Sequence, residues 1–447
     1  MKKTEDLFSN RQIYRLLWPL LIEQLLNVLV GMVDVVMVAS LGEAAVSGVS
    51  LVDSINSLVI QFLAAMTAGG TVVCSQFIGM KNEKKANQSA GQLFFITVSS
   101  SAALAVFCLI GGTHLLKLIF GQVEADVMGN AYTYFMITAL SFPFLAMYNS
   151  GAALFRSMEN SQISMRVSMF MNGLNVVGNA ICIFGLKMGV SGVAVPTLIS
   201  RMTAAFLIVY LLQKPENRIQ IQHISDMKPD LGIIGRILSI GIPGGVESGM
   251  FQFGKLMLQS LVSTLGTSAI AGYAVACNLV TFLYLPGNAL GLCLTTIVGQ
   301  CVGAGLPEQA KKYTRKLLVL NYGLLAVIAS VLAFGRYFWI HFYNLADASA
   351  DIAAGLVLAH SIAMIIWPVA FLIPHALRAA NDAAFTMVIA VVSMWVFRVA
   401  FAYLFVKGMH LSIYYVWYAM FIDWMFRTIV FLSRFRGFDR RIRKIVL

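Results

Sequence analysis

The stretch LLWPLLIEQLLNVLVGMVDVVMVASLG, residues 16–42, decides what kind of protein this chain forms. Its apolar run exceeds the roughly 20 residues that a helix needs to cross the hydrocarbon core of a bilayer. The run also contains two acidic residues, Glu23 and Asp34, and it follows a basic N-terminal segment. A cleavable signal peptide has a shorter and uninterrupted apolar region. We therefore interpret the stretch as a retained first membrane helix.

The whole chain has the composition of a membrane protein. Of its 447 residues, 59% are hydrophobic and only 12% are charged, whereas ordinary soluble domains have roughly 25% charged residues. The bilayer must therefore be the solvent for most of the chain. The pattern predicts an all-α polytopic protein with twelve transmembrane helices in two pseudo-symmetric six-helix bundles. The predicted helices cover approximately residues 14–39, 51–79, 91–118, 130–155, 163–186, 190–213, 237–262, 272–304, 313–340, 351–377, 384–406 and 411–433.

The basic residues alternate from loop to loop. Most of them lie in the termini and the even-numbered loops, and the exceptions in the other loops are Lys117, Lys187, Arg336 and Lys407. Because positively charged short loops resist translocation, both termini are expected in the cytoplasm. The net charge of +12 is thus explained by orientation, and we expect no nucleic-acid partner. Deep within the spans we expect only three basic residues: Arg201, Lys255 and Arg398.

Motifs for catalysis and metal binding are missing from the sequence. We find no paired-histidine motif, phosphate-binding loop or nucleophile elbow. The six cysteines have no metal-ligand spacing, so we expect neither disulfides nor a structural metal. We predict a protein that is not an enzyme and needs no cofactor. No loop is long enough for an ATP-binding domain, so an ion gradient is the expected energy source for any transport.

The chain repeats itself. Sliding the sequence along itself places Pro19 on Pro243 and Glu23 on Glu247. Because each half has an even number of predicted helices, both halves enter the membrane in the same direction, as in transporters whose two bundles move to expose a site to each side in turn. The predicted organisation is an N-terminal lobe (1–213), a cytoplasmic linker (214–236), a C-terminal lobe (237–433) and a basic cytoplasmic tail (434–447).

In this order, several segments resemble the multidrug and toxic compound extrusion (MATE) transporters, particularly a bacterial branch. Besides residues 16–42 they are SQFIG (75–79), MNGLNVVGNAICIFG (171–185), GIPGGVESGMFQFGKL (241–256) and VGQCVGAG (298–305). The resemblance covers essentially the whole chain. It implies two lobes in a V that alternate between outward-open and inward-open states. It also implies a monomer in the bacterial cytoplasmic (inner) membrane that exports cationic amphiphilic small molecules or drugs in exchange for H⁺ or Na⁺.

Glu23 and Asp34 are separated by three helical turns, so they lie on one face of the first helix. An ionisable group at membrane depth is costly and needs a partner, a cavity or a function. Asp34 matches the aspartate that belongs to the cation site of the N-terminal lobe in the resembled family. A buried acid that is only satisfied by hydrogen bonds is the other reading. We predict that Asp34 couples ion binding to transport, with Glu23 as a second member of the site.

Three asparagines follow one face of the predicted helix 163–186, namely Asn172, Asn175 and Asn179. Their carbonyls can coordinate Na⁺, and their amides can bind a carboxylate or join helices. Asn175, Asn179 and Thr197 match polar positions of the cation site in the resembled family. Some members of that family have aspartate at the position of Asn179. The asparagine leaves this chain one fewer titratable group, which favours Asp34 acting alone or Na⁺ bound by Asp34, Asn175 and Asn179.

The substrate cavity is expected to include Glu23, Glu247, Lys255, Gln252 and Asp53. Glu247 is the repeat counterpart of Glu23, and Lys255 lies on about the same side of its helix. Three roles for Glu247 remain open: it attracts a cationic substrate, it neutralises Lys255, or it binds a second coupling ion. For Asp53, the alternative to a role in the cavity is to cap the start of a helix.

Two other functions compete with export. A flippase for lipid-linked oligosaccharides or polysaccharides shares the two-bundle plan, but its pyrophosphate substrate favours a cavity rich in Arg or Lys. A membrane enzyme or a receptor without transport needs a catalytic constellation or a sizeable domain outside the membrane. Neither feature is evident in the sequence.

Overall fold

The computed structural model describes residues 6–121, 123–220 and 229–439. The basic stretch 440–447 of the predicted tail and residues 221–228 of the predicted linker lie outside these ranges. Within them the chain divides into two compact units. One comprises Phe8–Gly245, and the other combines Met1–Leu7 with Val246–Leu447.

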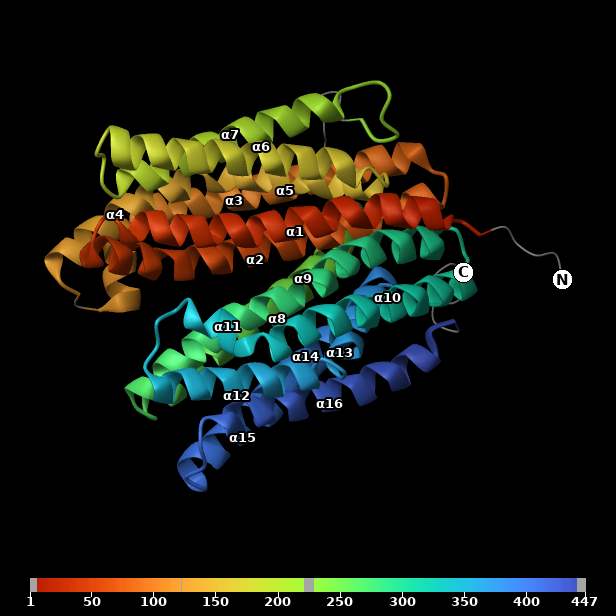
Figure 1. Cartoon of the computed structure of the whole chain (residues 1–447). Helices are drawn as coiled ribbons and strands as arrows, with labels where there is room; N and C mark the ends of the chain where they lie inside the picture. Colours follow the sequence, from red (N-terminus) through yellow and green to blue (C-terminus); the bar gives the residue numbers. More distant parts are fainter. Residues whose placement is uncertain (1–5, 122, 221–228, 440–447) are drawn as a thin grey trace. The chain divides into compact units, whose positions relative to one another are not determined.

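The unit Phe8–Gly245 is built from long helices that run alongside one another (Figure 1). In it, α1 packs against α6, α6 against α7, and α2 against α3, α4 and α5. The helices are α1 (Asn10–Ala39), α2 (Glu43–Gly79), α3 (Glu83–Phe120), α4 (Ala125–Leu140), α5 (Phe142–Ser157), α6 (Ser161–Ala180) with a π-helical end (Ile181–Gly185), α7 (Ser191–Leu212) and the first half of α8 (Leu231–Ser263).

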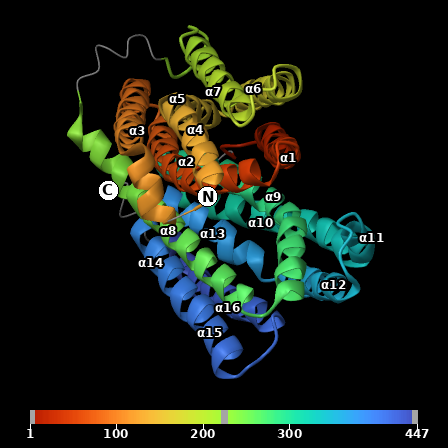
Figure 2. The same ribbon diagram turned by 90° about the vertical axis from the view of Figure 1, so that its left-hand side faces the viewer.

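The other unit starts within α8 and ends after α16, and in it α9 packs against α10, α12 and α13. The segment from α14 to α15 lies beside α16 (Figure 2). The helices are α9 (Thr267–Gly303), α10 (Pro307–Phe334), α11 (Arg336–His341), α12 (Asp347–Ala363), α13 (Trp367–Ala379), α14 (Ala383–Ser393), the π-helix η3 (Met394–Ala400), α15 (Phe401–Tyr403), the π-helix η4 (Leu404–Gly408) and α16 (Tyr414–Arg436).

The helices confirm the predicted fold class. In the ranges that the structure describes, nine helices are long and apolar enough to cross a membrane, and two bent pairs raise the number to eleven. The pairs are α4 with α5, bent by 46°, and α12 with α13, bent by 54°. The remaining predicted span corresponds to α8, which carries Arg236, Glu247 and Lys255. Each predicted segment therefore has a helical counterpart.

The break between α4 and α5 is held by a buried polar contact. Ser141 is fully buried at the break, and its hydroxyl donates to the carbonyl of Thr138 at 2.6 Å. The guanidinium of Arg201, from α7, in turn donates to the Ser141 hydroxyl at 2.7 Å. The carbonyl of Thr138 also accepts a hydrogen bond from the backbone N–H of Ser141 at 3.0 Å, and the Ser141 hydroxyl connects the break to Arg201 of α7.

Candidate functional site

Matching asparagine contacts connect α1 with α6. The amide of Asn172 donates to the side-chain oxygen of Asn27 at 3.0 Å, and the amide of Asn179 donates to Oδ1 of Asp34 at 2.9 Å. On each helix the two residues are two turns apart, and residues at that spacing share a face. The two contacts therefore run in the same order along parallel helices, and they bring Asp34 to the asparagines as the sequence predicts.

The Asp34 contact extends into a chain of hydrogen bonds. Asn179 also donates to the side-chain oxygen of Asn175 at 3.4 Å. The amide of Asn175 donates to the hydroxyl of Thr197 at 3.0 Å, and that hydroxyl donates to the carbonyl of Val193 at 2.9 Å. Asn175 and Asn179 are buried, at 7% and 0% exposure. Three helices, α1, α6 and α7, thus contribute to one polar chain that ends at a carboxylate.

This chain borders a cavity of about 490 Å³ within the unit Phe8–Gly245. Its wall contains five predicted site residues, from α1, α2, α6 and α7, together with an arginine. The polar residues of the wall are Asn27, Asp34, Ser50, Asp53, Tyr134, Asn172, Asn175, Thr197, Ser200 and Arg201. Asn179 is not part of the wall and holds Asp34 from behind it.

Asp53 is the second acid of the cavity wall. Its Oδ1 accepts hydrogen bonds from the hydroxyl of Tyr134 at 3.2 Å and from the amide of Asn56 at 3.4 Å. Asp34, Asp53 and Arg201 interact electrostatically with one another. The cavity wall thus has two carboxyl groups and one guanidinium, and this excess of negative charge can attract a cation.

A close helix approach places Tyr134 beside Asp53. A Cβ atom at Gly48 of α2 would lie 2.9 Å from the backbone nitrogen of Ala131 and from the backbone oxygen of Val127 in α4. Only glycine lets the two backbones come so near. Because Tyr134 lies one turn after Ala131 in α4, the contact brings its hydroxyl within reach of the α2 carboxylate.

Glu23 occupies a different environment from Asp34. It is 5% exposed and accepts a hydrogen bond from the hydroxyl of Ser164 in α6 at 2.7 Å. Tyr148 of α5 interacts with the same carboxyl group. Glu23 is not among the residues that line the cavity. The two acids of the first helix therefore both face α6, but only Asp34 reaches the cavity.

The structure separates the predicted residues of α8. Oε2 of Glu247 lies 3.6 Å from a guanidinium nitrogen of Arg378, and both side chains are about a fifth exposed. Lys255 lies near Arg398 and not in the ion pair of Glu247. Gln252 is half-buried on the same helix. Among the open roles of Glu247, charge neutralisation therefore takes place with Arg378 and not with Lys255.

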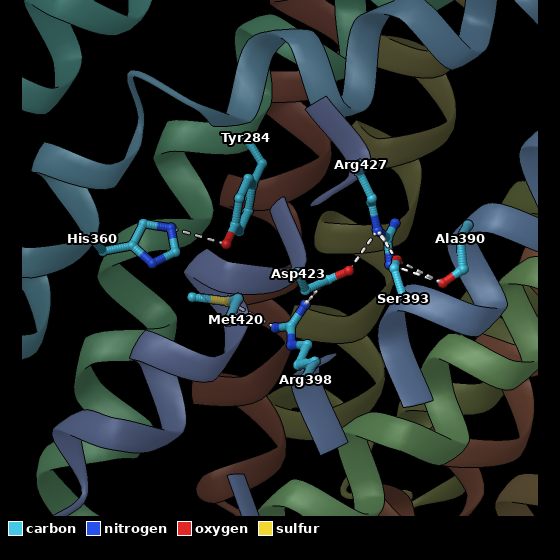
Figure 3. Close-up of polar contacts among 8 residues, drawn as sticks. All are labelled: Tyr284, His360, Ala390, Ser393, Arg398, Met420, Asp423 and Arg427. Carbon is cyan, nitrogen blue, oxygen red and sulfur yellow. Dashed lines mark hydrogen bonds and ion pairs between the residues drawn. The ribbon is translucent and has the colours of Figure 1, made fainter. Parts of the chain in front are cut away.

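Figure 3 shows a buried charge cluster that the sequence analysis missed. Asp423, fully buried in α16, accepts a hydrogen bond from Nε of Arg427 at 2.8 Å. Arg427 also donates to the hydroxyl of Ser393 at 2.7 Å and to the carbonyl of Ala390 at 3.1 Å. Arg427 is 4% exposed and belongs to α16, so a predicted span carries a buried basic residue besides the three that we expected.

Arg398 adds a second cation to this cluster, and its nearest guanidinium nitrogen lies 4.0 Å from Oδ2 of Asp423. Nearby, the hydroxyl of Tyr284 and Nε2 of buried His360 are 3.0 Å apart. A signal was present, because Asp423 and Arg427 are one turn apart in a predicted span and such pairs meet on a helix face.

The family model MatE matches residues 19–181 and 243–404, one segment in each half of the chain. An uncharacterized transporter, YisQ of Bacillus subtilis, is 27% identical over 97% of this chain and 94% of its own length. A probable multidrug resistance protein NorM of Thermotoga maritima is 24% identical over 94% of this chain and 90% of its own.

A solved structure has the same fold. It is described as the outward-facing conformation of a multidrug resistance MATE family transporter of the MOP superfamily. The match has a TM-score of 0.92 at 19% identity, and it covers 99% of this chain and 100% of the other chain. The family match, spread over both halves, confirms the resemblance inferred from the motifs. The chain belongs to the MatE family of membrane transporters.

Proposed function

We propose that this transporter is a secondary antiporter that exports small organic molecules in exchange for H⁺ or Na⁺. The coupling ion binds at Asp34, and the two halves alternate between access to one side of the membrane and to the other. One observation carries the proposal: a carboxylate on a cavity wall is held by a buried amide at 2.9 Å. An acid at membrane depth with this support indicates ion or proton binding.

The side-chain oxygen of Asn179 is available as a ligand or acceptor for the coupling ion. It is buried and has no hydrogen-bond partner, although buried polar atoms normally have one. A protonated Asp34 carboxyl group has an O–H that can donate to this oxygen. A bound Na⁺ would use the same oxygen as a ligand. Either ion therefore satisfies a group that is otherwise unsatisfied.

The residues also fit Na⁺ by their chemistry. Asp34, Asn175, Asn179 and Thr197 all present oxygen atoms, which hard cations prefer over nitrogen or sulfur. Asn172 extends the same polar face toward Asn27. Na⁺ here is a transported ion and not a resident cofactor. Glu23, in its separate environment, is a further protonatable group of the same half.

The names of relatives support the substrate class. The Thermotoga relative carries the name of a probable multidrug resistance protein, and the cavity holds more acidic than basic groups around apolar wall residues. We infer that cationic amphiphiles enter it, with Asp53 as an attracting acid. The relatives do not favour the flippase alternative. We further propose a monomer in the bacterial inner membrane with both termini in the cytoplasm, as the charge pattern indicates.

The test is transport by the purified protein in liposomes. A proton gradient and a sodium gradient are imposed separately, and movement of ethidium is followed by fluorescence. We expect one gradient to drive transport. Asp34→Asn is expected to lower this transport to the level of empty liposomes, because the amide neither takes up a proton nor supplies the charge that binds Na⁺.

The matched control is Asp126→Asn, which makes the same chemical change at an exposed position of α4. It should leave transport unchanged. Ethidium movement that responds to neither gradient would rule out coupled antiport. Full coupling in the Asp34→Asn variant would instead remove Asp34 from the mechanism.

A further inference from the structure

The unit that contains Val246–Leu447 carries more buried positive than negative charge at its centre. Arg398 and Arg427 converge on a single acid, Asp423, and Lys255 adds a third cation nearby. A charge removed from water is costly unless it is paired. The two guanidinium groups outnumber the single buried acid, and the exposed Lys255 adds to the same excess of positive charge.

Arg427 has hydrogen-bond partners on both sides of its guanidinium, and it contacts one of the two oxygens of Asp423. Its Nε donates to Asp423 at 2.8 Å, and its other bonds go to Ser393 and Ala390. Its side chain is 5% exposed. Arg427 therefore serves as the structural partner of the acid.

Arg398 is much less well satisfied. Its nearest contact to Asp423 is 4.0 Å, with a side chain that is 11% exposed. Its NH2 group contacts the thioether sulfur of Met420 at 2.8 Å, and thioethers are weak acceptors. Its Nε is buried without a hydrogen-bond partner. A guanidinium has five donors, so Arg398 retains unused capacity for an anion.

Lys255 of α8 and Arg398 both lie near the ring of Phe251. The amino group of Lys255 lies 5.9 Å from the ring centre of Phe251, and the guanidinium carbon of Arg398 lies 5.2 Å from that centre. The thiol of Cys277 interacts electrostatically with both cations. Lys255 is exposed, and among the described residues no acid forms an ion pair with it. Two like charges beside one ring repel each other unless an anion joins them.

We propose that Lys255 and Arg398 bind the anionic group of a small molecule, such as a carboxylate, sulfonate or phosphate, while the Phe251 ring contacts its apolar part. Arginine binds such planar or branched oxyanions with paired donors, and lysine adds a point charge. The site goes beyond the proposed function, because it assigns an anionic group to ligands of a transporter expected to take cations. Its test requires neither transport nor an ion gradient.

Cys277 provides the reporter. Methanethiosulfonate reagents form a mixed disulfide with a thiolate and release methanesulfinate. The protein in detergent is treated with the anionic ethylsulfonate reagent or the cationic ethyltrimethylammonium reagent, and the modification of each cysteine is followed by peptide mass spectrometry. Cys182, half-buried in the other unit, is the reference for intrinsic reactivity. Relative to Cys182, Cys277 should prefer the anionic reagent by roughly tenfold, the scale of a nearby charge at a protein surface.

Variants identify the source of this preference. Lys255→Gln should reduce it to about threefold or less, and Lys255→Arg should retain it, since the charge remains. Lys407→Gln is the matched control, because Lys407 is also exposed and lies 5.6 Å from a tyrosine ring centre. It should leave the preference intact. Melting temperatures confirm that each variant is folded.

Equal labelling by the two reagents, or a preference that persists in Lys255→Gln, would overturn the proposal. A Cys277 that neither reagent modifies while Cys182 reacts would overturn it too, because no small molecule would then reach the two cations.

Discussion

The side-chain amide of Asn179 donates to the carboxylate of Asp34 at 2.9 Å, and Asn179 is fully buried while Asp34 lines the cavity. The orientation of the acid on α1 is thus set by a residue of α6. The same amide also contacts Asn175, so the position of the carboxylate is linked to α7 through Thr197. Hydrogen bonds thereby connect Asp34 of α1 with α6 and α7.

Asn179→Leu is expected to reduce ion-driven transport by about tenfold or more. The substitution removes the donor and the unpaired oxygen together, and a lost hydrogen bond to a charged group is worth about 1.5–3 kcal/mol. The measurement is the initial rate of ethidium transport in liposomes. Asn288→Leu is the matched control, because it makes the same chemical change at an exposed position of α9 that is not on the cavity wall. Equal losses in both variants would show that the effect at Asn179 does not depend on its contact with Asp34.

Arg427→Met is expected to lower stability by about 3–5 kcal/mol, the usual cost of leaving a buried charge without its partner. Asp423 has no exposure, so water cannot replace the lost guanidinium. Thermal unfolding of the detergent-solubilised protein measures the effect. Arg434→Met is the comparison: Arg434 and Asp382 form a bidentate pair that is 30% and 19% exposed. A more exposed pair is worth about 1 kcal/mol or less, and a similar loss in both variants would contradict the argument from burial.

Gly48→Ala is expected to destabilise the unit Phe8–Gly245 by about 1–3 kcal/mol, the range for overpacking. The added methyl group would lie 2.9 Å from the α4 backbone and must push α4 away. Gly129→Ala provides the control within α4, because a Cβ there meets nothing within 4 Å. It should be neutral or slightly stabilising, since alanine favours helices over glycine by about 1 kcal/mol. Thermal unfolding compares the two, and tolerance of alanine at Gly48 would argue against the close approach.

The sequence by itself determined that the bilayer is the solvent of the chain, where the helices lie along it, and which family it resembles. Hydrophobicity and the spacing of apolar residues are local properties, so each predicted span has a helical counterpart. The repeat of Pro19 and Glu23 at Pro243 and Glu247 needed only a comparison of the chain with itself. Asp34 was recognisable because an acid at membrane depth is rare and costly.

Only the tertiary structure decided which polar groups meet. Asp34 and Glu23 share a helix face, yet only Asp34 lies on the cavity wall. Glu247 pairs with Arg378 from α13, a partner that no spacing within α8 indicates. Arg427 lies within α16 (Tyr414–Arg436), and its burial depends on how α14 packs against α16. Helix position along the chain is set by local pattern, whereas partners and burial are set by packing between segments that are far apart in the sequence.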